Sequence, residues 1–144
     1  MPNTAHFRKL ERMYAAAPCN EYYEPEIDIE EGKATLTMPV KEDQFHAAHA
    51  VHGSSYFKAL DDAAFFAVNS LVEDVFVLTS QFNLYLTRPI TEGWMEAVGE
   101  VVHESGSQFI ADAVVRDSDG NVIARGTGNF VKSRIALDED VGYR

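Results

Sequence analysis

Cysteine is almost missing from the 144-residue sequence, which contains Cys19 alone. A single cysteine cannot form an internal disulfide, and its scarcity favours a reducing compartment. Apolar runs are short as well, since none approaches the roughly 20 residues that a membrane-spanning helix needs. The AAAPC segment at 15–19 resembles the end of a lipoprotein leader, but charged residues precede it where a leader requires an apolar stretch. We therefore predict a cytoplasmic protein that is not held in a membrane.

Basic residues are the second scarcity, with 12 Lys and Arg against 23 Asp and Glu and a formal net charge of -11. So acidic a surface would repel nucleic acid and anionic membranes, and we expect neither as a partner. An anionic small substrate would require a local basic patch. Internal repeats and linkers are also missing, and 144 residues with 46% apolar content suit one core. We predict a single domain over 1–144.

Alternation of apolar and polar residues predicts a hairpin followed, after a helix, by four antiparallel strands. The expected strands cover 27–29, 36–40, 76–86, 94–103, 109–117 and 122–131. Apolar residues at helical spacing predict a short helix before Pro18 and a long apolar helix over 53–71. This order favours an α+β fold in which a curved antiparallel sheet wraps around one long central helix. We expect residues 138–144 to be frayed.

The long predicted helix carries an aspartate within its apolar face. That face is expected to consist of Phe57, Leu60, Ala64, Ala67, Val68 and Leu71. Asp61 falls among them, whereas Asp62 is turned about 100° further round and pairs with Lys58 at i,i+4 as a solvated ion pair. Burying a carboxylate without partners is unfavourable, so Asp61 is the first candidate for a catalytic role, with a raised pKa. The alternative is a structural aspartate hydrogen-bonded at a subunit contact.

The loop that leads into this helix contains His46, His49 and His52, and the helix begins with Gly53 and Ser54. A glycine at a helix N-terminus leaves a backbone N–H available for a negatively charged oxygen. Three histidines at three-residue spacing do not match the usual zinc-ligand patterns, so we predict no metal site.

Several segments together resemble the hotdog-fold acyl-CoA thioesterases, specifically the branch named for phenylacetate degradation. They are HG at 52–53, LDDAAF at 60–65, TSQFNLYLTRPI at 79–90, GEVVHESG at 99–106 and VVRDSDGNVIARGTGNF at 114–130. The resemblance covers about 27–134 and implies the hotdog fold. It also implies an enzyme that hydrolyses an acyl-CoA to a carboxylic acid and free CoA, with no cofactor beyond the CoA of the substrate. In that family the site lies between two subunits, and dimers pair into tetramers.

The resemblance implies a role for three residues. Asp61 would act as general base or nucleophile, the Gly53 N–H would bind the carbonyl oxygen, and Thr79 would help to place water. Strict alternation puts Thr79 on the strand face opposite Phe82 and Leu84, so this role requires a bulge or an exchange between subunits.

Two positions depart from the family pattern. His46 stands where an amide residue is common, and it is a candidate donor to the substrate carbonyl, while His52 is expected to orient the loop. Ser54 replaces the second glycine of the usual HGG, at the point where CoA would approach.

Candidates for substrate binding come from two residue types. Phe57, Phe65 and Tyr85 could line an acyl pocket or belong to the plain core. Arg88, Lys132 and Arg134 stand near predicted strand ends and could meet the phosphates of CoA, or be solvated surface charges.

Two other functions fit the same fold. A dehydratase or hydratase would pair a catalytic histidine with a carboxylate, but the HFPG-type loop of those enzymes is absent. A non-catalytic acyl-CoA binding module would use Asp61 only to position its ligand.

Overall fold

The structure is a computed structural model that describes residues 3–144. Its helices are α1 (Thr4–Ala16), α2 (Asn20–Tyr23) and α3 (Gly53–Asn69), with short 3-10 turns at Glu42–Gln44 and Glu139–Val141. Its strands are β1 (Glu26–Glu30), β2 (Lys33–Pro39), β3 (Val75–Leu86), β4 (Trp94–Glu104), β5 (Phe109–Arg116) and β6 (Val122–Ala136). The predicted α+β arrangement is confirmed, whereas α2 was not expected and β6 runs five residues further than the alternation indicated.

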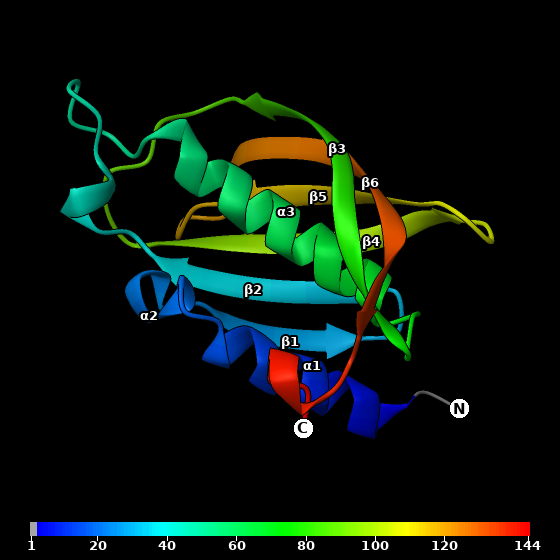
Figure 1. The fold of residues 1–144 in the computed structure, drawn as a ribbon. Helices are drawn as coiled ribbons and strands as arrows, with labels where there is room; N and C mark the ends of the chain where they lie inside the picture. The colour runs from blue at the N-terminus through cyan, green and yellow to red at the C-terminus, as the bar shows by residue number, and fades with distance from the viewer. Residues whose placement is uncertain (1–2) are drawn as a thin grey trace.

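The strands form one antiparallel sheet in the order β1-β2-β4-β5-β6-β3. The sheet curves around α3, which lies along its concave face (Figure 1). Because β3 is last in this order and pairs only with β6, its other edge is open in the protomer. This is the predicted hotdog arrangement.

Helix α3 approaches the sheet closely because its buried face is built from small residues. Ala59, Ala63 and Ala67 are fully buried, and the backbone of Ala63 lies against Gly99 of β4. The helix is therefore turned so that Tyr56, not Phe57, enters the core. Phe57 was expected in the buried stripe, but its side chain is 38% exposed and packs edge-on against Phe82.

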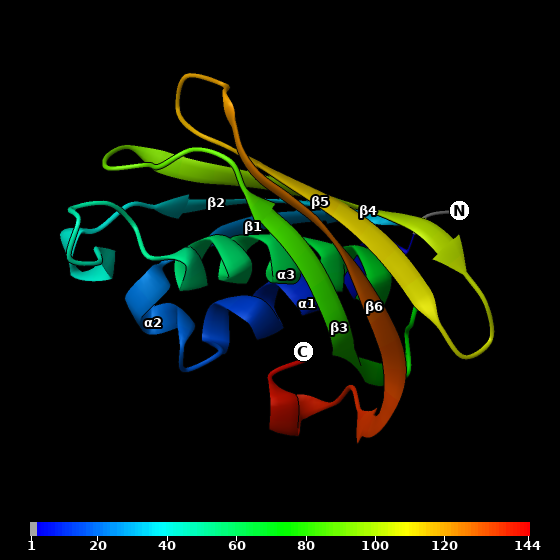
Figure 2. The same cartoon turned by 90° about the horizontal axis from the view of Figure 1, so that it is seen from above.

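Helix α1 covers the side of α3 that faces away from the middle of the sheet, and the C-terminal residues lie beside it (Figure 2). Phe7, Leu10 and Tyr14 of α1 are buried in a second cluster that includes Phe66 of α3. Asn3 caps the helix through a hydrogen bond from the His6 N–H. Among residues 3–144, none of the helices has the length and apolar character to cross a membrane.

The segment after β6 is docked against α1, so the expectation that residues 138–144 are frayed was wrong. The Tyr143 hydroxyl lies 2.7 Å from Nδ1 of the buried His6, and the Arg12 Nε–H donates to the Arg144 carbonyl at 2.5 Å. Val141 and Tyr143 pack on the α1 cluster. Sequence patterning missed these contacts because their partners lie at the opposite end of the chain.

Candidate functional site

A cavity of about 620 Å³ opens between α1, α3, the first half of β3 and the C-terminal residues. Its walls include three of the residues predicted for the site, namely Asp61, Phe65 and Thr79. Phe65 contacts Phe66, Phe76 and Phe130 through edge-on aromatic packing, so the cavity is apolar behind the aspartate. Volume and lining are those of a site for a small organic molecule.

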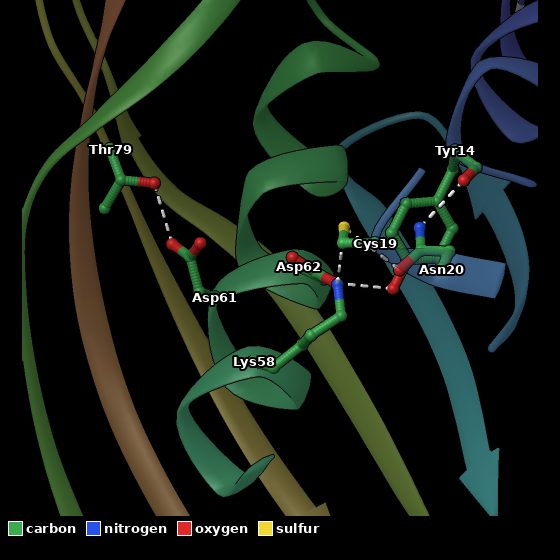
Figure 3. A network of polar contacts seen from close by, with 7 residues as sticks. All are labelled: Tyr14, Cys19, Asn20, Lys58, Asp61, Asp62 and Thr79. Atoms are coloured by element: carbon green, nitrogen blue, oxygen red, sulfur yellow. Dashed lines mark hydrogen bonds and ion pairs between the residues drawn. The ribbon is translucent and has the colours of Figure 1, made fainter. Parts of the chain in front are cut away.

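Asp61 projects from α3 toward β3, where its carboxylate accepts a hydrogen bond from the Thr79 hydroxyl at 2.7 Å (Figure 3). Burial raises the pKa of Asp61 from 3.8 to about 6; Asp62 adds to the rise, while the Thr79 hydrogen bond and Lys58 oppose it. The carboxylate is therefore ionised at neutral pH and basic enough to accept a proton. The raised pKa agrees with the sequence-based expectation.

Thr79 reaches Asp61 because β3 contains a bulge, one of the two arrangements that the prediction allowed. Thr79 pairs with Phe130 and Gln81 with Asn129, so Ser80 is an extra residue on β3. The extra residue allows Thr79 and Phe82, three positions apart, both to turn toward the helix. A regular strand would have placed the hydroxyl on the outer face.

A second polar cluster lies on the opposite side of the same cavity, around Asp62. Tyr14 donates to Asp62 at 2.5 Å, and the Lys58 ammonium lies 2.6 Å from the same oxygen (Figure 3). The side chains of Lys58 and Asp62 are only 15% and 17% exposed, so the expectation of a solvated pair was wrong. The rings of Tyr14 and Tyr23 cover the lysine. Burial, with Asp62 beside it, raises the pKa of Tyr14 far above its ordinary value, which keeps its hydroxyl a donor.

Gly53 and His46 lie away from this cluster, in a second cavity of about 310 Å³ at the start of α3 that Arg88 also lines. The His46 Nδ1 accepts a hydrogen bond from the Ala48 N–H, so the neutral imidazole carries its proton on Nε2 and can donate it elsewhere. His52 caps α3, since its Nδ1 accepts from the Ser54 N–H at 3.0 Å. Gly53 is the first residue of α3, so its N–H has no acceptor in its own helix, and among residues 3–144 no backbone hydrogen bond joins this N–H to another segment.

One protomer does not bring the two predicted halves of the site together. Gly53 and Asp61 are eight residues apart on α3, which corresponds to about 12 Å along the helix axis. A single carbonyl group cannot contact both.

The other predicted binding residues are dispersed. Tyr85 is 73% exposed on the open edge strand, and neither it nor Phe57 lines either cavity. Lys132 and Arg134 are exposed on β6, where Lys132 pairs with Val77, at the opposite end of β3 from Arg88. Within residues 3–144, His, Cys, Asp and Glu side chains form no group of three that could hold a metal ion.

A family model described as the thioesterase superfamily matches residues 48–124, from the loop before α3 to the third residue of β6. The match spans more than half of the chain and includes Gly53, Asp61 and Thr79. The chain belongs to the thioesterase superfamily. Membership indicates a hydrolase of thioester or ester bonds, and it confirms the resemblance at the level of the superfamily.

Solved structures of similar fold include the PaaI protein of Escherichia coli from the phenylacetic acid degradation operon. It is 20% identical with a TM-score of 0.85, and the match covers 94% of this chain and 99% of that one. A thioesterase family protein from Silicibacter pomeroyi is 26% identical with a TM-score of 0.81, covering 88% of this chain and 97% of that one. A protein of Saccharolobus solfataricus whose name describes it as a proposed esterase is 21% identical over 104 residues. This match covers 72% of this chain and 74% of the relative.

Proposed function

We propose that this superfamily member hydrolyses acyl-CoA thioesters, with Asp61 as general base or nucleophile. The observation that carries the proposal is the Asp61 carboxylate, partly buried at the wall of an apolar cavity and hydrogen-bonded to Thr79. A thioester carbonyl has weak resonance stabilisation, so its hydrolysis needs a positioned water or carboxylate at the carbon. The Thr79 hydroxyl holds one carboxylate oxygen, which leaves the other to face the substrate.

The negative charge that develops on the thioester oxygen needs a hydrogen-bond donor, and the Gly53 N–H at the start of α3 is our candidate. It adds the positive end of the helix dipole to a backbone donor, and one such donor is worth roughly a hundredfold or more in rate. His46, with its proton on Nε2, assists at the same cavity. His52 acts on the geometry of this helix start as its N-cap, because its Nδ1 accepts a hydrogen bond from the Ser54 N–H.

Because Gly53 and Asp61 are too far apart in one protomer, we propose that the working enzyme is at least a dimer. Each site would then combine Asp61 of one protomer with Gly53 of the other. The open edge of β3 supports this arrangement, since it exposes the apolar side chains Leu78, Tyr85 and Leu86. A pair of dimers is the larger assembly to test.

In this proposal CoA is part of the substrate and no separate cofactor takes part. Arg88 borders the cavity that contains Gly53, so it is the first of the basic candidates for a CoA phosphate. Lys132 and Arg134 lie at the other end of the sheet edge. They could bind the phosphates of the same CoA molecule as Arg88 only if they came from a different protomer.

The function is tested by incubating the purified protein with acetyl-, pentanoyl-, octanoyl- and benzoyl-CoA and following free thiol. We expect thiol release that is proportional to protein concentration with at least one substrate. A protein that releases no thiol, but melts at a higher temperature with one acyl-CoA bound, is a binding module instead. A parallel incubation with an enoyl-CoA tests the hydratase alternative, which would consume this substrate without releasing thiol.

The pH profile of hydrolysis is expected to follow the ionisation of Asp61. Below its pKa of about 6 the carboxyl is protonated and inactive, so kcat/KM should fall about tenfold per pH unit there and level off above. Thr79→Val removes a hydrogen bond that favours the ionised form, and the midpoint should therefore move to higher pH.

The matched control for this profile is Thr127→Val. Thr127 donates to Asp112 at 2.8 Å on the exposed part of the sheet, outside both cavities, so its loss should leave the midpoint in place. An equal shift in both variants, or a midpoint near the ordinary value for aspartate, would argue against Asp61 as the titrating group.

A further inference from the structure

We propose that the cavity of about 620 Å³ beside Asp61 is the acyl-binding compartment and that it selects uncharged, apolar acyl groups. This inference rests on the proposed function, since it places a thioester carbonyl at Asp61. It adds a substrate class, and it assigns a role to α1 and to the C-terminal residues.

The first support is the composition of the walls. Phe65, Phe66 and Phe76 line the side formed by α3 and β3, and Met13 and Val141 line the opposite side. An acyl chain whose carbonyl group lies at Asp61 would extend along these apolar side chains and bury its methylene groups against them. Each buried methylene should improve binding roughly fourfold until the compartment is full.

The second support is the sign of the charges around the cavity. Four acidic residues line it, Asp61, Asp62, Glu139 and Asp140, against the two basic residues Lys58 and Arg144. Lys58 is engaged by Asp62 at 2.6 Å beneath two tyrosine rings. The remaining acids, Asp61, Glu139 and Asp140, outnumber Arg144, so an acyl group that ends in a carboxylate would enter a space with an excess of negative charge.

The third support is that the far wall is held in place, which gives the compartment a definite depth. Tyr143 donates to His6 Nδ1 at 2.7 Å, and the His6 Nε2–H in turn donates to the Asn69 carbonyl at 2.9 Å. The Arg144 carbonyl accepts from Arg12. These contacts fix the C-terminal residues, and Val141 with them, to both α1 and α3.

Selection by charge is tested with two thioesters of equal carbon number, pentanoyl-CoA and glutaryl-CoA. The glutaryl group carries a carboxylate at the end that would lie deepest in the compartment. We expect its kcat/KM to be at least about a hundredfold lower, as for an unpartnered buried charge. Comparable values for the two substrates would overturn the charge selection while leaving the hydrolase proposal intact.

Selection by size is tested with Val141→Phe, which adds bulk at the far wall. The ratio of kcat/KM for octanoyl-CoA over acetyl-CoA should fall at least about tenfold. Val102→Phe makes the same change at an exposed position of β4 outside this cavity, and the ratio should stay as in the natural protein. An unchanged ratio in Val141→Phe would mean that the acyl chain lies elsewhere.

An assay that does not depend on turnover separates failure of this inference from failure of the proposed function. Cys19 is the single cysteine, it is exposed, and it lines the cavity across from Asp61. In Asp61→Asn, octanoyl-CoA should slow alkylation of Cys19 by iodoacetamide several-fold, whereas desulfo-CoA, which has no thiol to consume the reagent, should not. Equal rates with and without octanoyl-CoA, at concentrations that raise the melting temperature, would overturn the assignment of the compartment.

Discussion

Replacing Asp61 by asparagine is expected to lower kcat/KM for acyl-CoA hydrolysis by at least about a hundredfold, near 3 kcal/mol of transition-state stabilisation. Asparagine keeps the size of the side chain and can still hydrogen-bond Thr79, but it cannot take a proton from water or attack the carbonyl. The measurement is steady-state thiol release by the folded variant beside the natural protein.

Asp112→Asn is the matched control for this experiment. Asp112 also accepts a hydrogen bond from a threonine, but it is exposed on the sheet and lines neither cavity near α3. Its replacement should leave kcat/KM within about twofold. If Asp61→Asn retained full activity while folded, the carboxylate would have no part in the chemistry.

Replacing Asp61 by asparagine also changes the stability of the protein, and the pKa of Asp61 determines the sign of this change. Since the folded pKa of Asp61 is raised to about 6, its contribution to stability is fully present below about pH 4 and is lost as pH rises through 6. The shift corresponds to about 3 kcal/mol. Asp61→Asn should therefore increase the free energy of unfolding at pH 7.5 relative to the natural protein, and less so at pH 4.5, in urea titrations.

The second large effect is expected from Gly99→Ala in β4. A Cβ at Gly99 would lie 2.4 Å from the backbone carbonyl of Ala63, where α3 rests on the sheet. Backbone cannot rotate out of the way as a side chain can, so the helix and strand must separate. We expect a loss of about 3 kcal/mol in the free energy of unfolding, measured by denaturant titration.

Gly106→Ala is the control, because a Cβ there would meet no atom within 4 Å. Its effect should stay within about 0.5 kcal/mol. If both variants unfolded alike, the contact between Gly99 and Ala63 would not be limiting for stability.

Local periodicity was sufficient to predict most of the fold. Period-two alternation located the strands, and helical spacing located α3, because one face of each element is buried in a common core. The rotation of α3 was less well predicted: Phe57 was placed inside and Tyr56 was not considered. A stripe of Ala59, Ala63 and Ala67 has little weight in a hydrophobicity pattern, yet these small residues set the approach to the sheet.

For the candidate site, the sequence indicated the aspartate but not its surroundings. Asp61 stands out because a carboxylate in an apolar stripe is unusual, and Thr79 could be joined to it only by supposing a bulge or an exchange between subunits. Tyr14 and the C-terminal residues gave no local signal, because their contacts with α3 and α1 join segments distant in the chain. Asp62 was predicted to be solvated for the same reason. Its partner Lys58 lies on the same helix and follows from the spacing, whereas Tyr14, which covers the pair, comes from a distant segment.

In evolution, the bulge at Ser80 would allow β3 to gain or lose one residue while the side chains on both sides of the bulge keep their faces of the sheet. A relative that lacks a counterpart of Ser80 would keep the threonine and the following phenylalanine on the same face through ordinary alternation. A sequence alignment without a gap at this point would then pair the threonine of one protein with the residue next to the equivalent threonine in the other. The partner of Asp61 in such relatives is best located by its contact with the helix carboxylate, not by counting residues back from the Arg88-Pro89 pair.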